Sequence, residues 1–131
     1  MDKTKLYIIR HGKTMFNTIG RAQGWSDTSL TAEGELGLRE LRIGLRESGL
    51  TFSKAFSSDS GRTIQTMGIV LEELGLTGHI PYAFDKRIRE WCFGSFDGAY
   101  GGNLFHGVIP RVLDVEDYKK LSLQELADGL V

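Results

Sequence analysis

Apolar residues in the first two-thirds of the chain alternate between short runs and helical spacing. The run Leu6–Ile9 ends abruptly in a polar turn, which is typical of a buried parallel strand. Shorter strands are predicted at 54–58 and 80–84, the latter with a proline near its start. Helical spacing predicts helices at 31–48 and 62–74, each followed by a glycine. This alternation predicts an α/β fold whose parallel strands are joined by right-handed crossovers.

The first predicted helix carries glycines on its apolar face. Gly34, Gly37 and Gly44 recur among leucines at helical spacing. A glycine inside a helix costs about 1 kcal/mol relative to alanine. We therefore expect this helix backbone to lie close against a sheet.

The last third of the chain has a weaker pattern. Residues 85–102 are charged, aromatic and glycine-rich, which predicts a loop, and residues 103–131 show no strand pattern. Within them, 118–130 could form one amphipathic helix with Ser122 as its N-cap. A chain of 131 residues is long enough for one domain, so we expect a single domain over 1–131.

Composition narrows the function classes. Charged residues make up 25% of a chain whose net charge is -1, so nothing in the overall charge favours nucleic acid or an anionic membrane. The one cysteine excludes an intrachain disulfide. The apolar run near the N-terminus is too short for a signal peptide or a membrane span. These features predict a cytoplasmic protein with no nucleic-acid or membrane partner.

Candidate catalytic and anion-binding residues lie directly after the predicted strands. Arg10 and His11 come directly after the first, and Arg62 begins the helix after the second. Because the carboxyl ends of parallel strands meet at one edge of a sheet, both guanidinium groups could bind one anion. The N-terminal amides of that helix would add to the same field, and Asn17 could supply a neutral donor. A neutral His11 imidazole could then attack a phosphorus atom in line.

A carboxylate follows the third predicted strand. Near a bound phosphate dianion, Glu90 could keep a proton and deliver it to a leaving oxygen. Alternatively, Glu90 could be only an ion-pair partner for Arg87 or Arg89, which we expect to have structural roles. No cluster of histidines, cysteines or carboxylates has metal-ligand spacing, so we expect no metal and no cofactor.

Three motifs together resemble a known family. The first comprises Arg10-His11-Gly12-Lys13-Thr14, Asn17, Gln23-Gly24, Asp27, Leu30, Thr31 and Gly34. The second comprises Ser57-Ser58-Asp59, Arg62-Thr63 and Gln65-Thr66, and the third Arg87-Ile88-Arg89-Glu90, Phe93-Gly94 and Asp97-Gly98. Their order and spacing over residues 5–98 resemble the phosphoglycerate mutase-like branch of the histidine phosphatase superfamily.

The resemblance implies a fold and a set of roles. The fold would be a three-layer sandwich with a mostly parallel sheet, and the reaction a metal-independent phosphoryl transfer through a phosphohistidine. The substrate would be a small phosphorylated metabolite, and phosphate or sulfate would bind at the same place. Hydrolysis and isomerisation both stay open. The implied site comprises His11 as nucleophile, Glu90 as proton donor, Arg10, Asn17 and Arg62 around the phosphate, and the backbone of Gln23 and Gly24 along the pocket.

The sequence also departs from the family pattern. The family has a second histidine in a Ser-His-Gly turn after a later strand, and neither His79 nor His106 stands in such a turn. We therefore expect the fold to be incomplete in this chain, lacking the C-terminal part of the domain, with 99–131 as a lid or insertion. An incomplete sheet could self-associate. The alternative function is a phosphate-binding fragment or regulatory module without catalysis.

Overall fold

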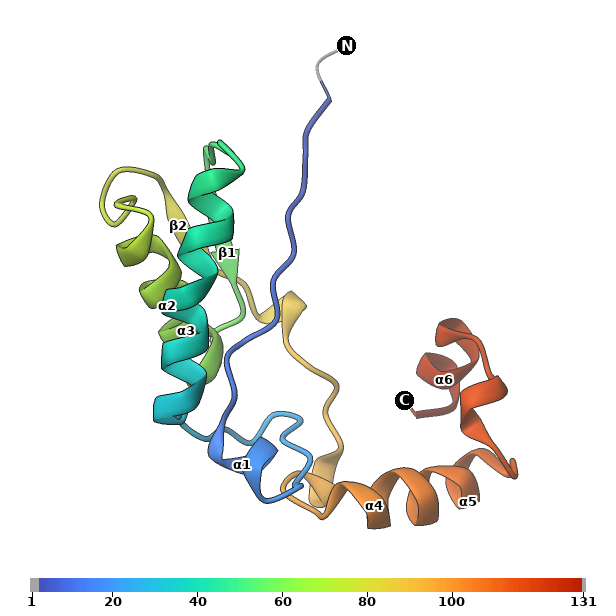
Figure 1. The fold of residues 1–131 in the computed structure, drawn as a ribbon. Helices are drawn as coiled ribbons and strands as arrows, with labels where there is room; N and C mark the ends of the chain where they lie inside the picture. Colours follow the sequence, from blue (N-terminus) through green and yellow to red (C-terminus); the bar gives the residue numbers. More distant parts are fainter. Residues whose placement is uncertain (1–2, 131) are drawn as a thin grey trace. The chain divides into compact units, whose positions relative to one another are not determined.

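The computed structural model of the chain describes residues 3–130 and divides it into two compact units (Figure 1). The first unit comprises residues 1–15 and 27–89, and the second comprises residues 16–26 and 90–131. Each unit is described by itself below. Among the described residues, no helix is long and apolar enough to cross a membrane.

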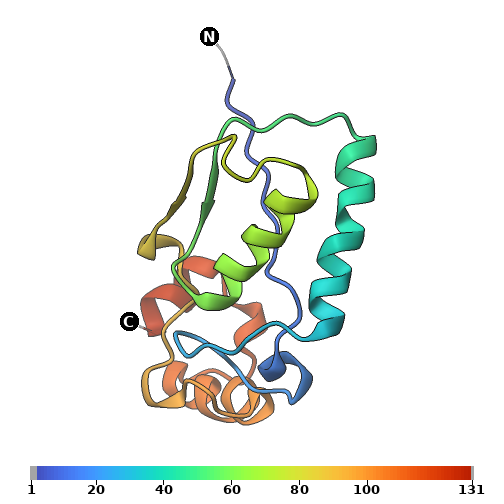
Figure 2. The ribbon, with the colours of Figure 1, turned by 90° about the vertical axis from the view of Figure 1, so that its left-hand side faces the viewer.

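Two helices form the centre of the first unit. They are α2 (Ala32–Glu47) and α3 (Gly61–Glu73), which pack side by side (Figure 2). The hydroxyl of Thr31 caps α2 by accepting a hydrogen bond from the amide of Gly34. The core lies between the helices and is formed by Leu30, Leu38, Ile69 and Val70. Both predicted helices are confirmed to within one residue at each end.

The two helices are also joined by ion pairs on their outer surface. Arg39 and Arg42 of α2 both donate to the carboxylate of Glu73 at the end of α3, over 2.7 and 2.8 Å. The hydrogen bond from Arg39 holds the pKa of Glu73 below its usual range. This contact holds α2 against α3 at the end remote from Arg62.

The sheet of the first unit contains two parallel strands. β1 (Ala55–Ser57) pairs with β2 (Tyr82–Phe84), with Ala55 opposite Tyr82 and Ser57 opposite Phe84. Helix α3 lies between them in the chain, so the unit contains a βαβ crossover. The second and third predicted strands are therefore confirmed, as is the α/β class.

The first predicted strand is not formed, and that prediction is wrong for this structure. Residues 6–9 lie in an extended segment that belongs to no strand (Figure 2). The side chains of Leu6 and Ile8 are 81% and 84% exposed. A buried parallel strand needs paired neighbours and cover on both faces. In the described part of the chain the sheet contains only β1 and β2, which pair with each other, so the apolar run remains exposed.

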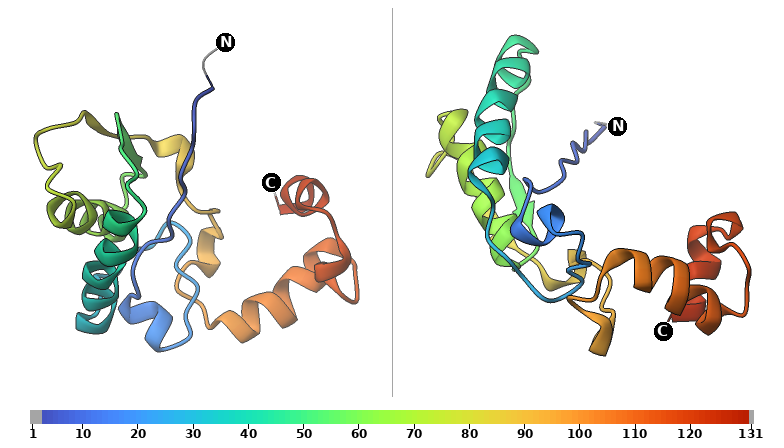
Figure 3. Two further views of the ribbon diagram at one scale, coloured as in Figure 1. Left: turned by 45° about the horizontal axis from the view of Figure 1, so that its top comes forward. Right: turned by 60° about the horizontal axis from the view of Figure 1, so that its bottom comes forward.

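The second unit is mainly helical. α4 (Gly101–Asn103), a π-helical turn (Leu104–Val108) and α5 (Ile109–Leu113) follow one another as a continuous rod (Figure 3). Leu104 and Ile109 are its buried side chains. Residues 103–130 contain no strand, as predicted. A single helical turn, α1 (Met15–Thr18), follows Thr14 and precedes α2 in the chain.

The last helix is shorter than predicted. A 3-10 turn (Tyr118–Lys120) precedes α6 (Leu123–Leu130). The reason is the cap: the hydroxyl of Ser122 accepts from the amide of Glu125, and the amide of Ser122 donates to the carboxylate of Glu125. The amide of Ser122 also lowers the pKa of Glu125. The predicted N-cap residue is therefore confirmed, and the helix begins directly after it.

Candidate functional site

The half-buried His11 follows the extended segment of the first unit. Its ring atom Nδ1 lies 2.8 Å from the carbonyl oxygen of Gly12. A carbonyl oxygen can only accept a hydrogen bond, so Nδ1 carries the proton. In the neutral ring the lone pair is then on Nε2. This contact sets the tautomer that a nucleophilic histidine needs.

Helix α3 holds the next residue of the turn. The amide of Gly12 donates to the hydroxyl of Thr66 over 3.0 Å, and that hydroxyl donates to the carbonyl oxygen of Arg62 over 2.7 Å. Thr66 is 3% exposed. These bonds connect the His11–Gly12 turn to the first turn of α3, and so to the residue that carries the predicted phosphate-binding guanidinium.

Helix α2 holds the other side of the turn. The amide of Thr31 donates to the carbonyl oxygen of Lys13 over 2.8 Å. Gly34 lies so close to Lys13 that a β-carbon at this position would overlap the Lys13 backbone. A β-carbon on Gly12 would lie 2.9 Å from a methyl group of Leu38. Glycine is required at position 34, where two backbone segments meet, whereas the atom nearest to a β-carbon at position 12 is the end of a flexible side chain.

Arg62 is the most buried charged residue of the candidate site. Its side chain is 3% exposed, and its Nη1 donates to Oδ1 of Asp27 over 3.0 Å. The backbone amide of Arg62 also lies 3.3 Å from the same oxygen. The side chain of Ser60, at the N-cap of α3, makes no capping bond. Asp27 thus binds both the guanidinium and the amino end of the helix.

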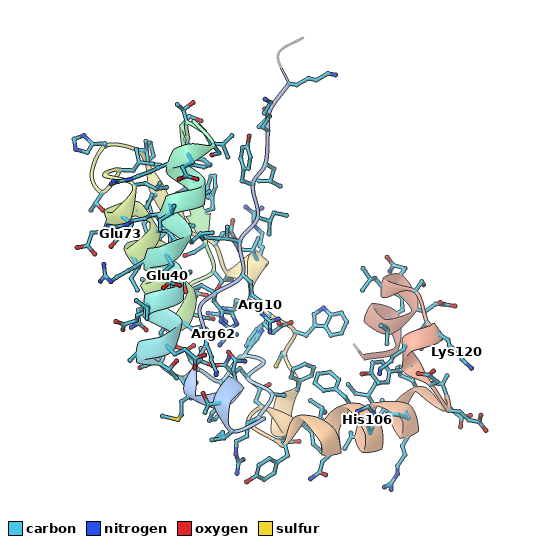
Figure 4. All side chains as sticks on the ribbon, in the orientation of Figure 1. Arg10, Glu40, Arg62, Glu73, His106 and Lys120 are labelled. Atoms are coloured by element: carbon cyan, nitrogen blue, oxygen red, sulfur yellow. The ribbon has the colours of Figure 1, made fainter. Side chains whose placement is uncertain are left out.

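Arg10 shares the first unit with His11 and Arg62. Its side chain is exposed, and Figure 4 shows it on the segment that leads into the His11 turn. The structure therefore places the first three predicted site residues on two segments that are hydrogen-bonded to each other through Thr66.

The other predicted site residues belong to the second unit. Gly24 has a φ of +56°, and a β-carbon there would overlap the carboxylate of Asp97. Asp97 accepts from the amides of Trp25 and Phe93, over 3.1 and 2.9 Å. The indole of Trp25 donates to the carbonyl oxygen of Glu90 over 2.9 Å. The loop after α1 and residues 90–97 of the third motif are therefore joined within this unit.

Within the second unit, the predicted residues differ in exposure. Gln23 is 7% exposed, and its carbonyl oxygen accepts from the amide of Ser26. Asn17 is exposed on α1, and Glu90 is exposed, with its carboxylate accepting from the amide of Trp91 over 2.8 Å. The convergence of Asn17 and Glu90 on His11 stays a prediction.

These motifs were compared with known proteins. Residues 6–101 match the Histidine phosphatase superfamily (branch 1). The chain belongs to this superfamily. The matched range agrees with the resemblance inferred from the three motifs over residues 5–98.

Relatives of this histidine phosphatase chain include two curated proteins named as phosphoglycerate mutases. Probable phosphoglycerate mutase GpmB of Salmonella choleraesuis is 38% identical over 69% of this chain and 39% of its own length. The 2,3-bisphosphoglycerate-dependent phosphoglycerate mutase 2 of Bacteroides thetaiotaomicron is 33% identical over 72% of this chain and 38% of its own length. The chain therefore matches well under half the length of these relatives.

A solved structure has the same fold as this histidine phosphatase chain. The crystal structure of phosphoglycerate mutase from Bacillus anthracis str. Sterne superimposes with a TM-score of 0.79 at 35% identity. The match covers 92% of this chain and 52% of that protein. It confirms the phosphoglycerate mutase-like fold class.

The arginines of the third histidine phosphatase motif have carboxylate partners. Arg87 binds Asp85, and this hydrogen bond lowers the pKa of Asp85 from 3.8 to about 2. Arg89 donates through Nε and Nη2 to both carboxylate oxygens of Asp59, over 2.5 Å each, and lowers the pKa of Asp59. Both contacts agree with the structural roles expected for these arginines.

The remaining histidines lie elsewhere in the histidine phosphatase chain. His79 is exposed in the turn before β2, and His106 is exposed in the π-helical turn of the second unit (Figure 4). Over residues 3–130, no group of three or more histidine, cysteine, aspartate or glutamate side chains could hold a metal ion.

Thr66 and Asp27 lie within the quoted motifs, but the sequence alone predicts a role for neither. A signal for Thr66 existed, because it lies four residues after Arg62 and so on the same face of the helix. Asp27 carries no such local signal. Its contact with Arg62 spans 35 positions and arises only when the loop before α2 packs against α3.

Proposed function

We propose that this chain binds the phosphate group of a small phosphomonoester and transfers the phosphoryl group to Nε2 of His11. The observation that carries the proposal is the 2.8 Å contact between Nδ1 of His11 and the carbonyl oxygen of Gly12. It leaves the lone pair of the neutral ring on Nε2, the atom that would attack phosphorus. Superfamily membership supports the same reaction class.

The proposed step is an in-line displacement. Nε2 of His11 forms a bond to phosphorus while the ester P–O bond breaks, and the leaving oxygen takes a proton. We assign that proton to Glu90. Water then attacks the phosphohistidine and releases inorganic phosphate, or the phosphoryl group returns to another oxygen of the product.

Arg62 and Arg10 would stabilise charge on the non-bridging phosphate oxygens. The Arg62 guanidinium is supported for this role by its burial and by its bond to Asp27, because an orientation fixed before binding does not have to be ordered during the reaction. The amides of the first turn of α3 add positive potential at the same end of the helix.

The substrate class is proposed from two sources. The names of the relatives refer to phosphoglycerate mutases, which supports a small phosphorylated hydroxy acid. Residues 99–131, the proposed lid, contain three basic residues: Arg111, Lys119 and Lys120. An isomerase must hold a second charged group of its substrate while the intermediate reorients, which needs further basic side chains. The small number of basic residues in 99–131 therefore favours hydrolysis over isomerisation.

Turnover of a chromogenic phosphomonoester tests this proposal. The chain is mixed with para-nitrophenyl phosphate, and release of nitrophenol is compared for the natural chain, His11→Ala and His79→Ala. His79 is the matched control because it is an exposed histidine of the same unit. We expect turnover to be lost with His11→Ala and kept with His79→Ala. Equal turnover in the natural chain and His11→Ala would refute the mechanism.

Phosphate binding without turnover is the second candidate function. It is favoured by the positions of His79 and His106, because neither belongs to a turn that follows a described strand. In that case the chain binds inorganic phosphate in a calorimetric titration, Arg62→Ala abolishes the binding, and para-nitrophenyl phosphate is not hydrolysed. Turnover that depends on His11 would exclude this candidate.

A further inference from the structure

We propose that Thr66 is a positioning residue that keeps the His11 turn in a fixed relation to Arg62. This inference rests on the proposed function, because it concerns the geometry of the same phosphoryl transfer. Thr66 would not touch the substrate. It would act through the peptide of Gly12 on one side and through the first turn of α3 on the other.

One hydroxyl group makes both contacts. The Thr66 hydroxyl accepts from the amide of Gly12 over 3.0 Å and donates its own hydrogen to the carbonyl oxygen of Arg62 over 2.7 Å. A hydroxyl has one hydrogen to donate and two lone pairs to accept with, so both bonds can exist together. The donated bond, from residue 66 back to residue 62, fixes the Thr66 side chain against its own helix.

Gly12 transmits the position of Thr66 to the imidazole. Its amide binds Thr66, and its carbonyl oxygen accepts from Nδ1 of His11. The two groups belong to consecutive peptide units that share the α-carbon of Gly12, so a displacement of this residue shifts both bonds. The imidazole of His11 is therefore fixed relative to α3 by three consecutive hydrogen bonds that end at the backbone of Arg62.

Burial makes this arrangement effective. Thr66 is 3% exposed, so water does not readily replace its hydroxyl as the partner of Gly12. An unsatisfied amide in such a place is destabilising, so the turn would shift to find another partner. Misplacement of a reacting group by about 1 Å can slow a reaction by about 100-fold.

Two substitutions separate positioning from packing. Thr66→Ser keeps the hydroxyl and loses a methyl group, whereas Thr66→Val keeps the shape and loses both hydrogen bonds. Thr77→Val is the matched control, because Thr77 is exposed in the turn after α3. The readouts are the hydrogen exchange of the Gly12 amide, the tautomer of His11 from nitrogen NMR shifts, and the rate of phosphate incorporation into His11 from para-nitrophenyl phosphate.

We expect Thr66→Val to raise the exchange rate of the Gly12 amide by about 10-fold or more and to slow phosphate incorporation by about 10- to 100-fold. The His11 ring is expected to become a mixture of tautomers. Thr66→Ser is expected to stay within about 3-fold of the natural chain in both rates, and Thr77→Val to leave them unchanged. Natural exchange and incorporation rates in folded Thr66→Val would overturn the proposal.

The test separates failure of this inference from failure of the proposed function. If the natural chain incorporates no phosphate, the proposed function fails, and the Gly12 exchange rates and the His11 tautomer still decide whether Thr66 holds the turn. If Thr66→Val does not fold, the exchange rate of the Gly12 amide in the natural chain and in Thr66→Ser decides whether Thr66 holds the turn. An unprotected Gly12 amide in the natural chain would overturn the positioning role.

Discussion

Arg62 and Asp27 form a half-buried ion pair in which one carboxylate oxygen faces both the guanidinium and the backbone amide of the arginine. The side-chain contact is 3.0 Å and the amide contact 3.3 Å. The guanidinium is 3% exposed, and this carboxylate gives it a charged partner. Asp27 therefore orients the group that we propose to bind phosphate.

Asp27→Asn tests this relationship. The amide keeps an oxygen that can accept from Arg62 but loses the negative charge beside it. We expect the free energy of unfolding to fall by about 1–3 kcal/mol in urea titrations. Glu33→Gln, which removes a carboxylate from the exposed pair with Lys13, is the control and should cost less than about 1 kcal/mol. Equal losses for the two variants would contradict the role of Asp27.

Gly34→Ala tests the close approach of α2 to the His11 turn. An alanine β-carbon would overlap the backbone of Lys13, so we expect a loss of about 1–3 kcal/mol in unfolding free energy. Gly44→Ala is the matched control on the same helix, since its β-carbon would meet no atom within 4 Å. It should raise stability by about 0.5–1 kcal/mol. A stabilising Gly34→Ala would show that the turn does not lie against α2.

The Asp85–Arg87 pair predicts a change in stability at acid pH. Because the folded pKa of Asp85 is lowered from 3.8 to about 2, its contribution is fully present above pH 4 and is lost as the pH falls towards 2. Asp85→Asn keeps an acceptor for the amide of Arg87 and removes the titration. The difference in urea midpoint between the natural chain and Asp85→Asn should therefore shrink below about pH 4. A difference that does not change with pH would contradict the pair.

The exposed segment before His11 predicts self-association. Leu6 and Ile8 are large apolar side chains more than 80% exposed on an extended segment that belongs to no strand, which is a surface that pairs readily with another chain. We expect the natural chain to elute above its monomer mass of 14.6 kDa in size-exclusion chromatography. Ile8→Lys should shift it towards the monomer. A natural chain that is a stable monomer at every concentration would contradict the expectation.

Helices α2 and α3 and the N-cap of α6 were predictable because their signals are local, whereas α1, α4 and α5 were not predicted. Thr31 and Ser122 cap helices through hydrogen bonds to residues three positions later, and Gly49 ends a helix with a φ of +66°. Such signals need no information about the rest of the fold.

Features that depend on distant contacts were predicted less well. Leu6–Ile9 has the composition of a strand, but pairing needs neighbours that composition does not specify. Three helix glycines looked alike in sequence, yet a β-carbon would meet nearby atoms at Gly34 and none within 4 Å at Gly37 or Gly44. The glycine pattern predicted a close approach to a sheet, but the close approach observed at Gly34 is to the backbone of Lys13, which lies in no strand.

The candidate site likewise combines residues that have local sequence signals with contacts between residues that are distant in the sequence. The positions of Arg62 and His11 were predictable, because Arg62 lies in the first turn of a helix after a strand and His11 follows an apolar run, and their roles in the site stay predictions. The contacts that hold them, from Asp27 and Thr66, span 35 and 54 positions and needed the folded structure. Asn17, Gln23, Gly24 and Glu90 stay predicted members of the phosphate site.

The most direct test of the account is to locate phosphate on the protein. The chain is mixed with para-nitrophenyl phosphate, denatured in base to preserve phosphohistidine, digested and analysed by mass spectrometry, with His11→Asn and His79→Ala in parallel. We expect phosphate on the peptide that contains His11 in the natural chain and in His79→Ala, and none in His11→Asn. Phosphate on another residue, or an unmodified His11 in a natural chain that hydrolyses the ester, would contradict it.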